Sequence, residues 1–284
     1  MISGTRYNLT LEINRQLSLA QQIAYGQSQI STTKRLQAPS DDPVAAARIA
    51  QIGITQTDET TWSFNLDGAA ALSARADTAL TGVENALRRA NELILSGANG
   101  TMSDADRQTV ALELRSIADE LSGYAATKDV RGDDLFPAGN PMQIPVGDGM
   151  TLAAVASKSD VFTVTTASGP QDMAALVAGA ADAFDLADPT AREAAVKQSI
   201  DDVGAAAQHA ATEHGKQGAR GNRIDQLTEG LADSGLQLKE ERSGLEDTDV
   251  TAVVAKLQSQ QLTLQAAQAV FARVNQNTLF DLLR

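Results

Sequence analysis

The stretch Pro-Ser-Asp-Asp-Pro at residues 39–43 places two carboxylates side by side, and it is the part of the sequence that most invites a chemical interpretation. Paired aspartates can bind a metal ion or exchange protons in a reaction, but both uses need further groups that converge from elsewhere in the chain. A helix N-cap needs only a short acceptor side chain directly before a proline at the first helical position. Asp42 and Pro43 supply this after a turn at Ser40, so the stretch favours a helix start over a catalytic or metal site.

Few other residues could carry catalysis or hold a cofactor. His209 and His214 are five residues apart, which is the wrong spacing for two metal ligands on one helical face, and the chain has no cysteine. We interpret both histidines as solvated side chains on a polar stretch. Glycine motifs for phosphate binding and for a serine nucleophile are absent as well. The sequence therefore predicts a protein that is not an enzyme, with no cofactor and no metal.

The charge and the hydropathy of the chain exclude two further classes of partner. The formal net charge is -13, whereas binding to a nucleic-acid backbone needs lysine and arginine clustered on one face. The first residues contain no continuous apolar segment of the kind found in Sec signal peptides, and no stretch approaches the roughly 18 apolar residues of a membrane span. We expect no nucleic-acid partner, no Sec signal and no insertion into a membrane.

Apolar residues that recur every three or four positions predict that most of the chain is helical. The expected helices run over about residues 9–36, 43–96, 103–124, 189–245 and 250 to the end. Ser103, with Asp106 three residues later, has the pattern of a capping box and predicts the start of the third of these helices. The second and third helices should form a hairpin. Gly215–Gly221 and Gln217 indicate a soft middle in the helix over 189–245.

The segment between the hairpin and the long helix at 189–245 has a different composition. Residues 131–170 hold four of the seven prolines, and two β-leaning stretches occur at 142–146 and 161–165. We expect a small β-containing insert there, followed by a short helix at about 171–185.

Both ends of the chain carry narrow apolar stripes at helical spacing. The N-terminal stripe consists of Ile13, Leu17, Ala20, Ala24 and Ile30, and the C-terminal stripe, after a cap at Thr248 or Asp249, of Val250, Leu257, Leu264, Phe271 and Val274. Glutamine and asparagine flank both stripes, so neither helix can bury much apolar area alone. We expect the stripes to pack against each other and against neighbouring subunits.

The fold class predicted from these elements is mainly α, an elongated antiparallel helical bundle or coiled coil formed by the N- and C-terminal helices, with a small central β-containing insert. The expected domains are the terminal helices at 1–40 and 250–284, a helical rod at 41–130 and 189–249, and an α+β insert at 131–188.

Several stretches are similar in content and order to the flagellin-like family. Ile30–Arg35 followed by Pro39–Ala46 resembles the N-terminal signature of flagellins and, more closely, of the FlgL group of flagellar hook-associated proteins. That family usually has a glycine where this chain has Thr33. The remaining similar stretches are the hairpin turn at Asn99–Arg107, the β segment at Pro145–Gly149, the helix entry at Gly218–Arg223 and the C-terminal end at Asn277–Leu283.

This resemblance implies a structural subunit of the bacterial flagellum. It implies export of the unfolded chain through the flagellar type III apparatus with the help of an export chaperone, an extracellular location, and self-association in a ring at the junction of hook and filament. The implied neighbours are another hook-associated protein and flagellin. Flagellin itself is an alternative with the same terminal architecture, and a helical coiled-coil signalling or binding module is an alternative from another class.

Overall fold

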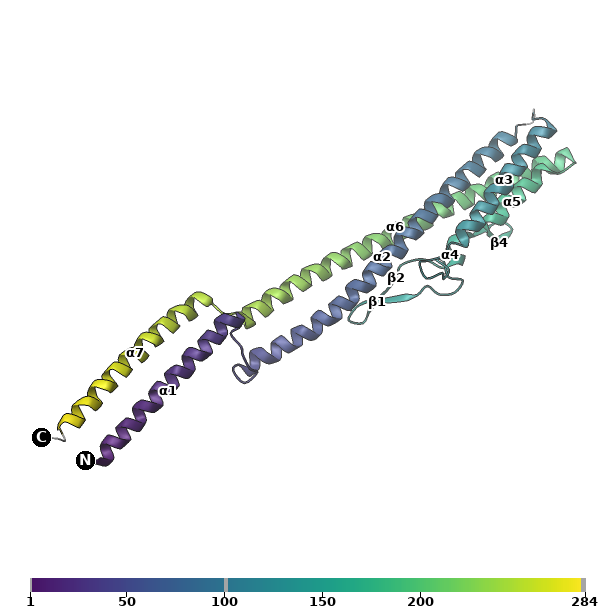
Figure 1. The fold of residues 1–284 in the computed structure, drawn as a ribbon. Coiled ribbons are helices and arrows are strands. Elements are labelled where there is room, and N and C mark those ends of the chain that lie inside the picture. The colour runs from purple at the N-terminus through teal and green to yellow at the C-terminus, as the bar shows by residue number, and fades with distance from the viewer. Residues whose placement is uncertain (1, 100–101, 282–284) are drawn as a thin grey trace. The chain divides into compact units, whose positions relative to one another are not determined.

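The computed structural model describes residues 2–99 and 102–281, with the side chains of residues 10–99 and 102–273. Its helices are α1 (Ile2–Thr32), α2 (Pro43–Gly97), α3 (Asp104–Ala125), α4 (Lys158–Phe162), α5 (Met173–Phe184), α6 (Pro189–Glu246) and α7 (Val250–Asp281) (Figure 1). Its strands are β1 (Gln143–Gly147), β2 (Met150–Ala153), β3 (Thr163–Thr166) and β4 (Gly169–Asp172). The prediction of a mainly α chain with a small β-containing insert is confirmed.

The chain divides into two compact units. The terminal unit comprises Met1–Asp58 and Ser234–Arg284, and the central unit comprises Glu59–Asp233. Helices α2 and α6 contribute residues to both units, and strands β1 to β4 belong to the central unit. The three-domain division drawn from the sequence stays a prediction.

Helices α2, α3, α5 and α6 of the central unit share one hydrophobic core, which the β segments extend. The ring of Phe136 meets Phe162 edge-to-face, with 5.3 Å between centroids. Fully buried side chains of this core are Leu66, Leu80, Leu87 and Ile94 of α2, Leu114 and Leu121 of α3, Met173 of α5, and Ile224 of α6. The predicted hairpin of α2 and α3 is present, and an ion pair of 2.6 Å between Arg89 and Glu113 joins its two helices.

Two glycines of α2 differ in what surrounds them. Helix α2 contains Gly53, Gly68 and Gly82, residues of low helix propensity, yet it runs unbroken from Pro43 to Gly97. A Cβ at Gly82 would overlap the ring of Tyr124 on α3, whereas one at Gly68 would meet nothing within 4 Å. Gly82 therefore permits the close approach of α3, a packing gain that outweighs the low helix propensity of glycine.

The β segments form two antiparallel pairs rather than one sheet. Strand β1 pairs with β2, with an irregularity between Pro145 and Gly147, and β3 pairs with β4. The β assignment of 161–165 was wrong at its start, because Val161 and Phe162 end the short helix α4 and the strand begins at Thr163. Ser157 starts that helix, since its Oγ accepts a hydrogen bond from the amide of Asp160 at 3.1 Å.

The expected soft middle of α6 was also wrong, because α6 is a continuous helix across residues 215–221. Gln217, which is only 1% exposed, donates from Nε2 to Ser73 Oγ on α2 and to the carbonyl oxygen of Ala154, both at 2.9 Å. Its Oε1 accepts a hydrogen bond from Arg220 at 3.3 Å. A buried polar side chain with its partners satisfied holds the helix in register rather than weakening it.

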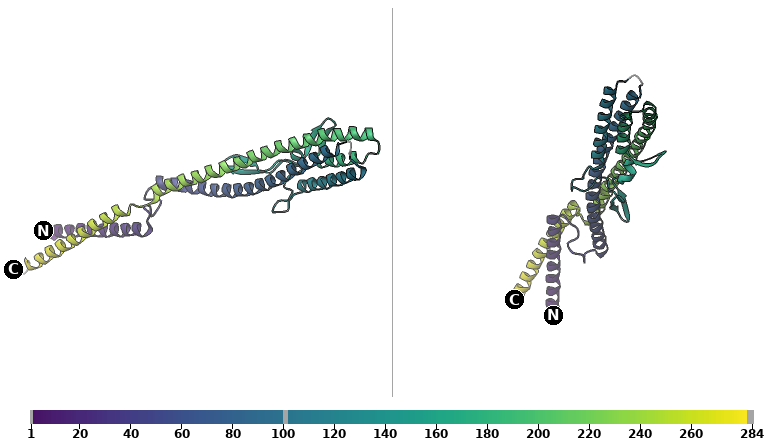
Figure 2. Two further views of the ribbon diagram at one scale, coloured as in Figure 1. Left: turned by 90° about the horizontal axis from the view of Figure 1, so that it is seen from above. Right: turned by 90° about the vertical axis from the view of Figure 1, so that its right-hand side faces the viewer.

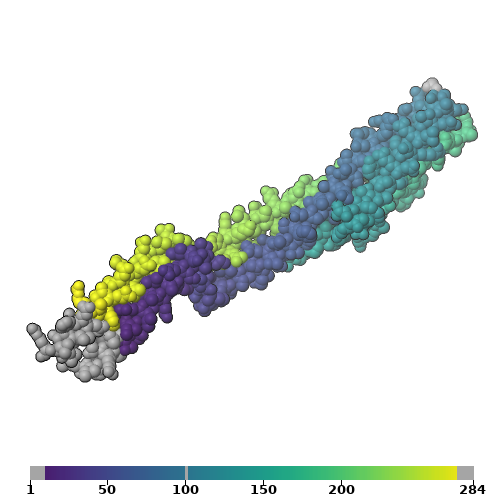
Figure 3. Space-filling model, in the orientation of Figure 1, coloured from purple at the N-terminus to yellow at the C-terminus, as the bar shows by residue number. Residues whose placement is uncertain are grey.

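In the terminal unit, α1 and α7 lie side by side and run in opposite directions (Figures 1 and 2). Figure 3 shows the purple surface of α1 against the yellow surface of α7. Helix α1 ends at Thr32, four residues before the predicted end, because Thr33 has a φ of 58°. A residue in the left-handed region cannot continue a right-handed helix. Among the described residues, no helix is both long and apolar enough to cross a membrane.

Candidate assembly surface of the terminal helices

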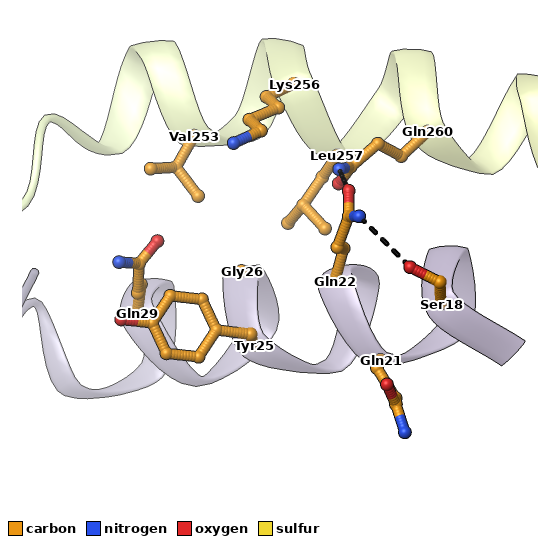
Figure 4. A pocket seen from close by; sticks show the side chains of 10 residues that line it. All are labelled: Ser18, Gln21, Gln22, Tyr25, Gly26, Gln29, Val253, Lys256, Leu257 and Gln260. Atoms are coloured by element: carbon orange, nitrogen blue, oxygen red, sulfur yellow. Dashed lines mark hydrogen bonds between the residues drawn. The ribbon is translucent and has the colours of Figure 1, made fainter. Parts of the chain in front are cut away.

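The contact between α1 and α7 is a seam of residues spaced alternately by three and four positions on both helices, the spacing of a coiled coil. Leu257 is 7% exposed and lies over Gly26, where an added Cβ would be 3.0 Å from Leu257 Cδ2 (Figure 4). The partly or fully buried seam residues are Gln16, Leu19, Ile23, Gly26 and Ile30 on α1, and Val253, Leu257, Gln260, Leu264, Ala267 and Phe271 on α7.

Polar side chains make up much of this seam. Gln260 Nε2 donates to Gln22 Oε1 at 2.7 Å, and Gln22 Nε2 donates to Ser18 Oγ at 3.4 Å (Figure 4). A groove of about 460 Å³ opens between the helices beside these residues. The seam therefore buries little apolar area for two helices of 31 and 32 residues, so it stabilises the pair weakly.

The predicted stripe residues differ in their exposure. Ile30, Leu257, Leu264 and Phe271 lie on the seam. Ile13 and Leu17 are 42% and 56% exposed, Val250 is 41% exposed, and Ala20 and Ala24 are exposed too. The side chain of Val274 lies outside the described residues.

The prediction that the N-terminal stripe packs on α7 is therefore wrong for Ile13, Leu17, Ala20 and Ala24. These residues are exposed because α1 meets α7 with a different, adjacent face of its helix. Sequence reasoning missed Leu19, Ile23 and Gly26. The signal that could have found them is their strict alternation of four and three residues, which continues to Ile30. Contacts of the exposed stripe with other subunits stay a prediction.

Several large apolar side chains of α1 and α7 face solvent. Leu262 and Val270 on α7 are 69% and 63% exposed, and Leu11 and Val254 are 46% and 37% exposed. Together with Ile13 and Leu17 they give the helix pair apolar groups both on the seam and outside it. These exposed apolar side chains are candidates for contacts with other proteins.

The paired aspartates organise the loop that follows α1. The predicted cap is confirmed, because Asp42 Oδ1 accepts from the amide of Ala45 at 3.0 Å and Pro43 is the first residue of α2. Asp41 Oδ2 lies 3.0 Å from the amides of Gln37 and Ala38, from which it accepts hydrogen bonds. Ser40 lies in the turn before the cap, and the cap itself is Asp42.

Hydrogen bonds define the environment of Asp41. The amides of Ala38 and Gln37, followed by the hydroxyl of Tyr25 at 3.0 Å, hold the pKa of Asp41 below its usual value. Burial and the bond to Asp41 raise the pKa of Tyr25. No group of three or more candidate metal ligands occurs among the described residues. Sequence reasoning found the role of Asp42 and missed that of Asp41.

A short antiparallel clasp ties residues 33–35 to residues 246–248. Arg35 N donates to Glu246 O at 2.7 Å, and Thr248 N donates to Thr33 O at 2.9 Å. Lys34 and Arg242 both pair with the carboxylate of Glu246, and together they lower the pKa of that group. The clasp holds the ends of α1 and α6 together and leads directly into α7.

The caps of two further helices follow the predictions. Ser103 Oγ accepts from the amide of Asp106 at 3.2 Å, which is the predicted cap of α3. Asp249 Oδ1 accepts from the amide of Ala252 at 3.0 Å, so Asp249 rather than Thr248 caps α7. These bonds satisfy amides that have no partner within their own helix.

The histidines differ from the prediction of solvated side chains. His209 Nε2 lies 2.8 Å from the carbonyl oxygen of Asp160. His214 places both ring nitrogens against carboxylates of α2. Neither ring has the partners of a metal site within the described part of the chain.

The central unit presents an apolar groove of its own. It has a volume of about 480 Å³ and lies between α2, residues 129–131 and the start of β1. Phe64 and Val130 at its rim are each 78% exposed, and Met142 is 54% exposed. The groove is a second surface on which association with another protein would cover apolar groups.

Comparison with known proteins gives the same family over nearly the whole chain. Residues 7–140 match the bacterial flagellin N-terminal helical region, and residues 200–283 match the bacterial flagellin C-terminal helical region. Flagellar hook-associated protein 3 of Escherichia coli (strain K12) is 24% identical, with 93% of this chain and 94% of that protein covered.

Two solved structures share the fold. One, of a putative flagellar hook-associated protein from Vibrio parahaemolyticus, has a TM-score of 0.65 at 18% identity and covers 73% of this chain and all of that chain. The other, of the flagellar junction protein FlgL from Legionella pneumophila, has a TM-score of 0.57 at 14% identity and covers 70% of this chain and all of that chain. With both terminal regions matched and these relatives covered over nearly their full length, the chain belongs to the bacterial flagellin family of flagellar structural proteins.

Proposed function

We propose that this protein is a structural subunit that joins hook and filament in the bacterial flagellum. The observation that carries the proposal is the exposed apolar surface of α1 and α7. Ile13, Leu17 and Leu262 stand in solvent on helices whose mutual seam is rich in glutamine. A helix pair of this kind gains stability when other copies or neighbouring proteins cover it.

The proposal extends to the assembly and its partners. Copies of the chain associate in a ring through the terminal helices, with flagellin on one side and another hook-associated protein on the other. The chain reaches this extracellular position through the flagellar type III apparatus, escorted by an export chaperone. The resemblance of relatives named as hook-associated and junction proteins supports this assignment.

Deletion of the gene and complementation with variants test the proposal. Cells without the protein should keep their hooks, lack filaments and release flagellin into the medium. The full chain should restore filaments, and a chain that ends at Asp249 should not. Normal filaments in the deleted strain, or with the truncated chain, would overturn the proposal.

A pair of neighbouring substitutions tests the exposed apolar surface itself. Leu262→Glu places a charge on a side chain that is 69% exposed, so the isolated protein should fold as before while incorporation is lost. Gln261→Glu is the matched control, because Gln261 is exposed too and already polar. Equal complementation by both variants would show that the Leu262 face stays in solvent.

Flagellin is the second candidate, because both matched family regions are those of flagellin. The two functions differ in what the purified protein does alone. A filament subunit polymerises into long filaments, whereas a junction subunit stops at a short, closed assembly. Electron microscopy of the concentrated protein separates them, and long filaments would favour flagellin.

A further inference from the structure

His214 stands between two carboxylates in the central unit, and the proposed assembly role does not use it. Its Nε2 lies 3.0 Å from Asp77 Oδ1, and its Nδ1 lies 3.0 Å from Glu84 Oε1. Both acids belong to α2 and are seven residues apart, so they lie on one face of that helix two turns apart. The imidazole of α6 thus bridges two points on its neighbouring helix.

This bridge is complete only when the ring is charged. An imidazolium donates from both nitrogens, whereas a neutral imidazole has a single N–H and turns a lone pair toward the other carboxylate. Loss of the proton therefore removes one hydrogen bond and leaves two carboxylates beside an uncharged ring. The attraction between α2 and α6 at this point is therefore weakened.

The surroundings of the ring favour the charged form. Burial of the ring, 25% exposed in its side chain, lowers its pKa, and the hydrogen bonds and charges of Glu84 and Asp77 outweigh burial and raise the pKa above 6.5. Among the described residues, the charges that act on the ring belong to α2. On α6 itself, the adjoining charges of Glu213 and Lys216 pair with each other at 2.6 Å.

We propose that His214 is a pH-responsive clamp that fastens α6 to α2 in the central unit and loosens as the medium becomes alkaline. The clamp lies one turn before Gln217, whose hydrogen bonds reach Ser73 of α2 and Ala154, the residue directly after β2. Release of His214 therefore weakens the packing of α6 on α2, next to the hydrogen bonds that Gln217 makes with α2 and with the β segments.

The sign of the pH dependence follows from the raised pKa. The stability contributed by the charged ring is fully present below the unfolded-state pKa of 6.5 and is lost as the pH rises through the folded-state pKa. The clamp should thus hold at pH 6 and be open at pH 9.

Nuclear magnetic resonance on the full chain measures the clamp directly, since the protein has two histidines and His209→Gln assigns them. The His214 signal should titrate with a midpoint above 6.5, and the midpoint should fall in a variant that combines Asp77→Asn with Glu84→Gln. A midpoint at or below 6.5 in the unmodified chain would overturn the proposal.

Thermal unfolding gives a second readout. His214→Gln should lower the melting temperature relative to the unmodified chain at pH 6 and lose that difference at pH 9. His209→Gln is the comparison on the same helix, because the His209 ring faces the backbone carbonyl oxygen of Asp160 rather than two carboxylates. A difference for His214→Gln that does not shrink at pH 9 would contradict the clamp even if the variant is less stable.

Discussion

Thr33→Gly should strengthen the clasp between the end of α1 and the end of α6. Among the described residues, Thr33 is the one non-glycine residue with a positive φ, which is 58°. A residue with a Cβ is destabilised by roughly 1–2 kcal/mol in the left-handed region of φ/ψ space, and a β-branched side chain is especially rare there. Glycine removes this strain.

The net gain is smaller than the strain, because glycine has more freedom to lose on folding. That loss is about 0.5–1 kcal/mol. The Thr33 hydroxyl donates to the carbonyl of Thr32 at 2.7 Å, an exposed bond that water replaces at little cost. The expected net stabilisation is about 0.5–1 kcal/mol, which corresponds to roughly a twofold to fivefold change in an opening equilibrium.

Amide hydrogen exchange of the full chain measures this change where it occurs. The amides of Arg35 and Thr248 close the clasp, and their exchange should slow by roughly twofold to fivefold in Thr33→Gly. Ser31→Gly is the control, because Ser31 is helical and glycine there should speed exchange instead. Unchanged or faster exchange in Thr33→Gly would refute the strain at Thr33.

Three further substitutions test other contacts by chemical denaturation or local hydrogen exchange. Gln217→Leu should lower the free energy of unfolding of the central unit by about 2 kcal/mol, because it leaves a buried carbonyl without its donor; no loss would mean that water replaces the amide. Asp42→Ala should destabilise the first turn of α2 by about 1 kcal/mol and weaken assembly, and unchanged exchange there would exclude the cap. Gly82→Ala should destabilise the central unit by about 1–3 kcal/mol through overlap with Tyr124, whereas Gly68→Ala should stabilise it by up to about 1 kcal/mol; equal effects would contradict the packing.

Much of the fold could be predicted because its signals are local. Asp42 before Pro43 and Ser103 before Asp106 are caps that need only neighbouring residues, and both form as expected. The seven-residue spacing of Leu257, Leu264 and Phe271 likewise identified the inner face of α7. Short-range hydrogen bonding and helical periodicity are written in consecutive residues.

The remaining features depend on partners that are distant in the sequence. Gly26 is a seam residue only because Leu257 lies over it, and a scan for apolar side chains cannot select a glycine. Gln217 resembles a weak point until Ser73 and Ala154 supply its partners. The role of His214 likewise needs two acids more than 100 residues away.

The most direct test of the central claim is the position of the protein in intact flagella. An epitope inserted after Gly139, which is exposed and has open space around it, would leave both terminal helices unchanged. Electron microscopy with a gold-labelled antibody should show label confined to the boundary between hook and filament. Label distributed along the filament, or absent from flagella of a complemented strain, would contradict a junction subunit.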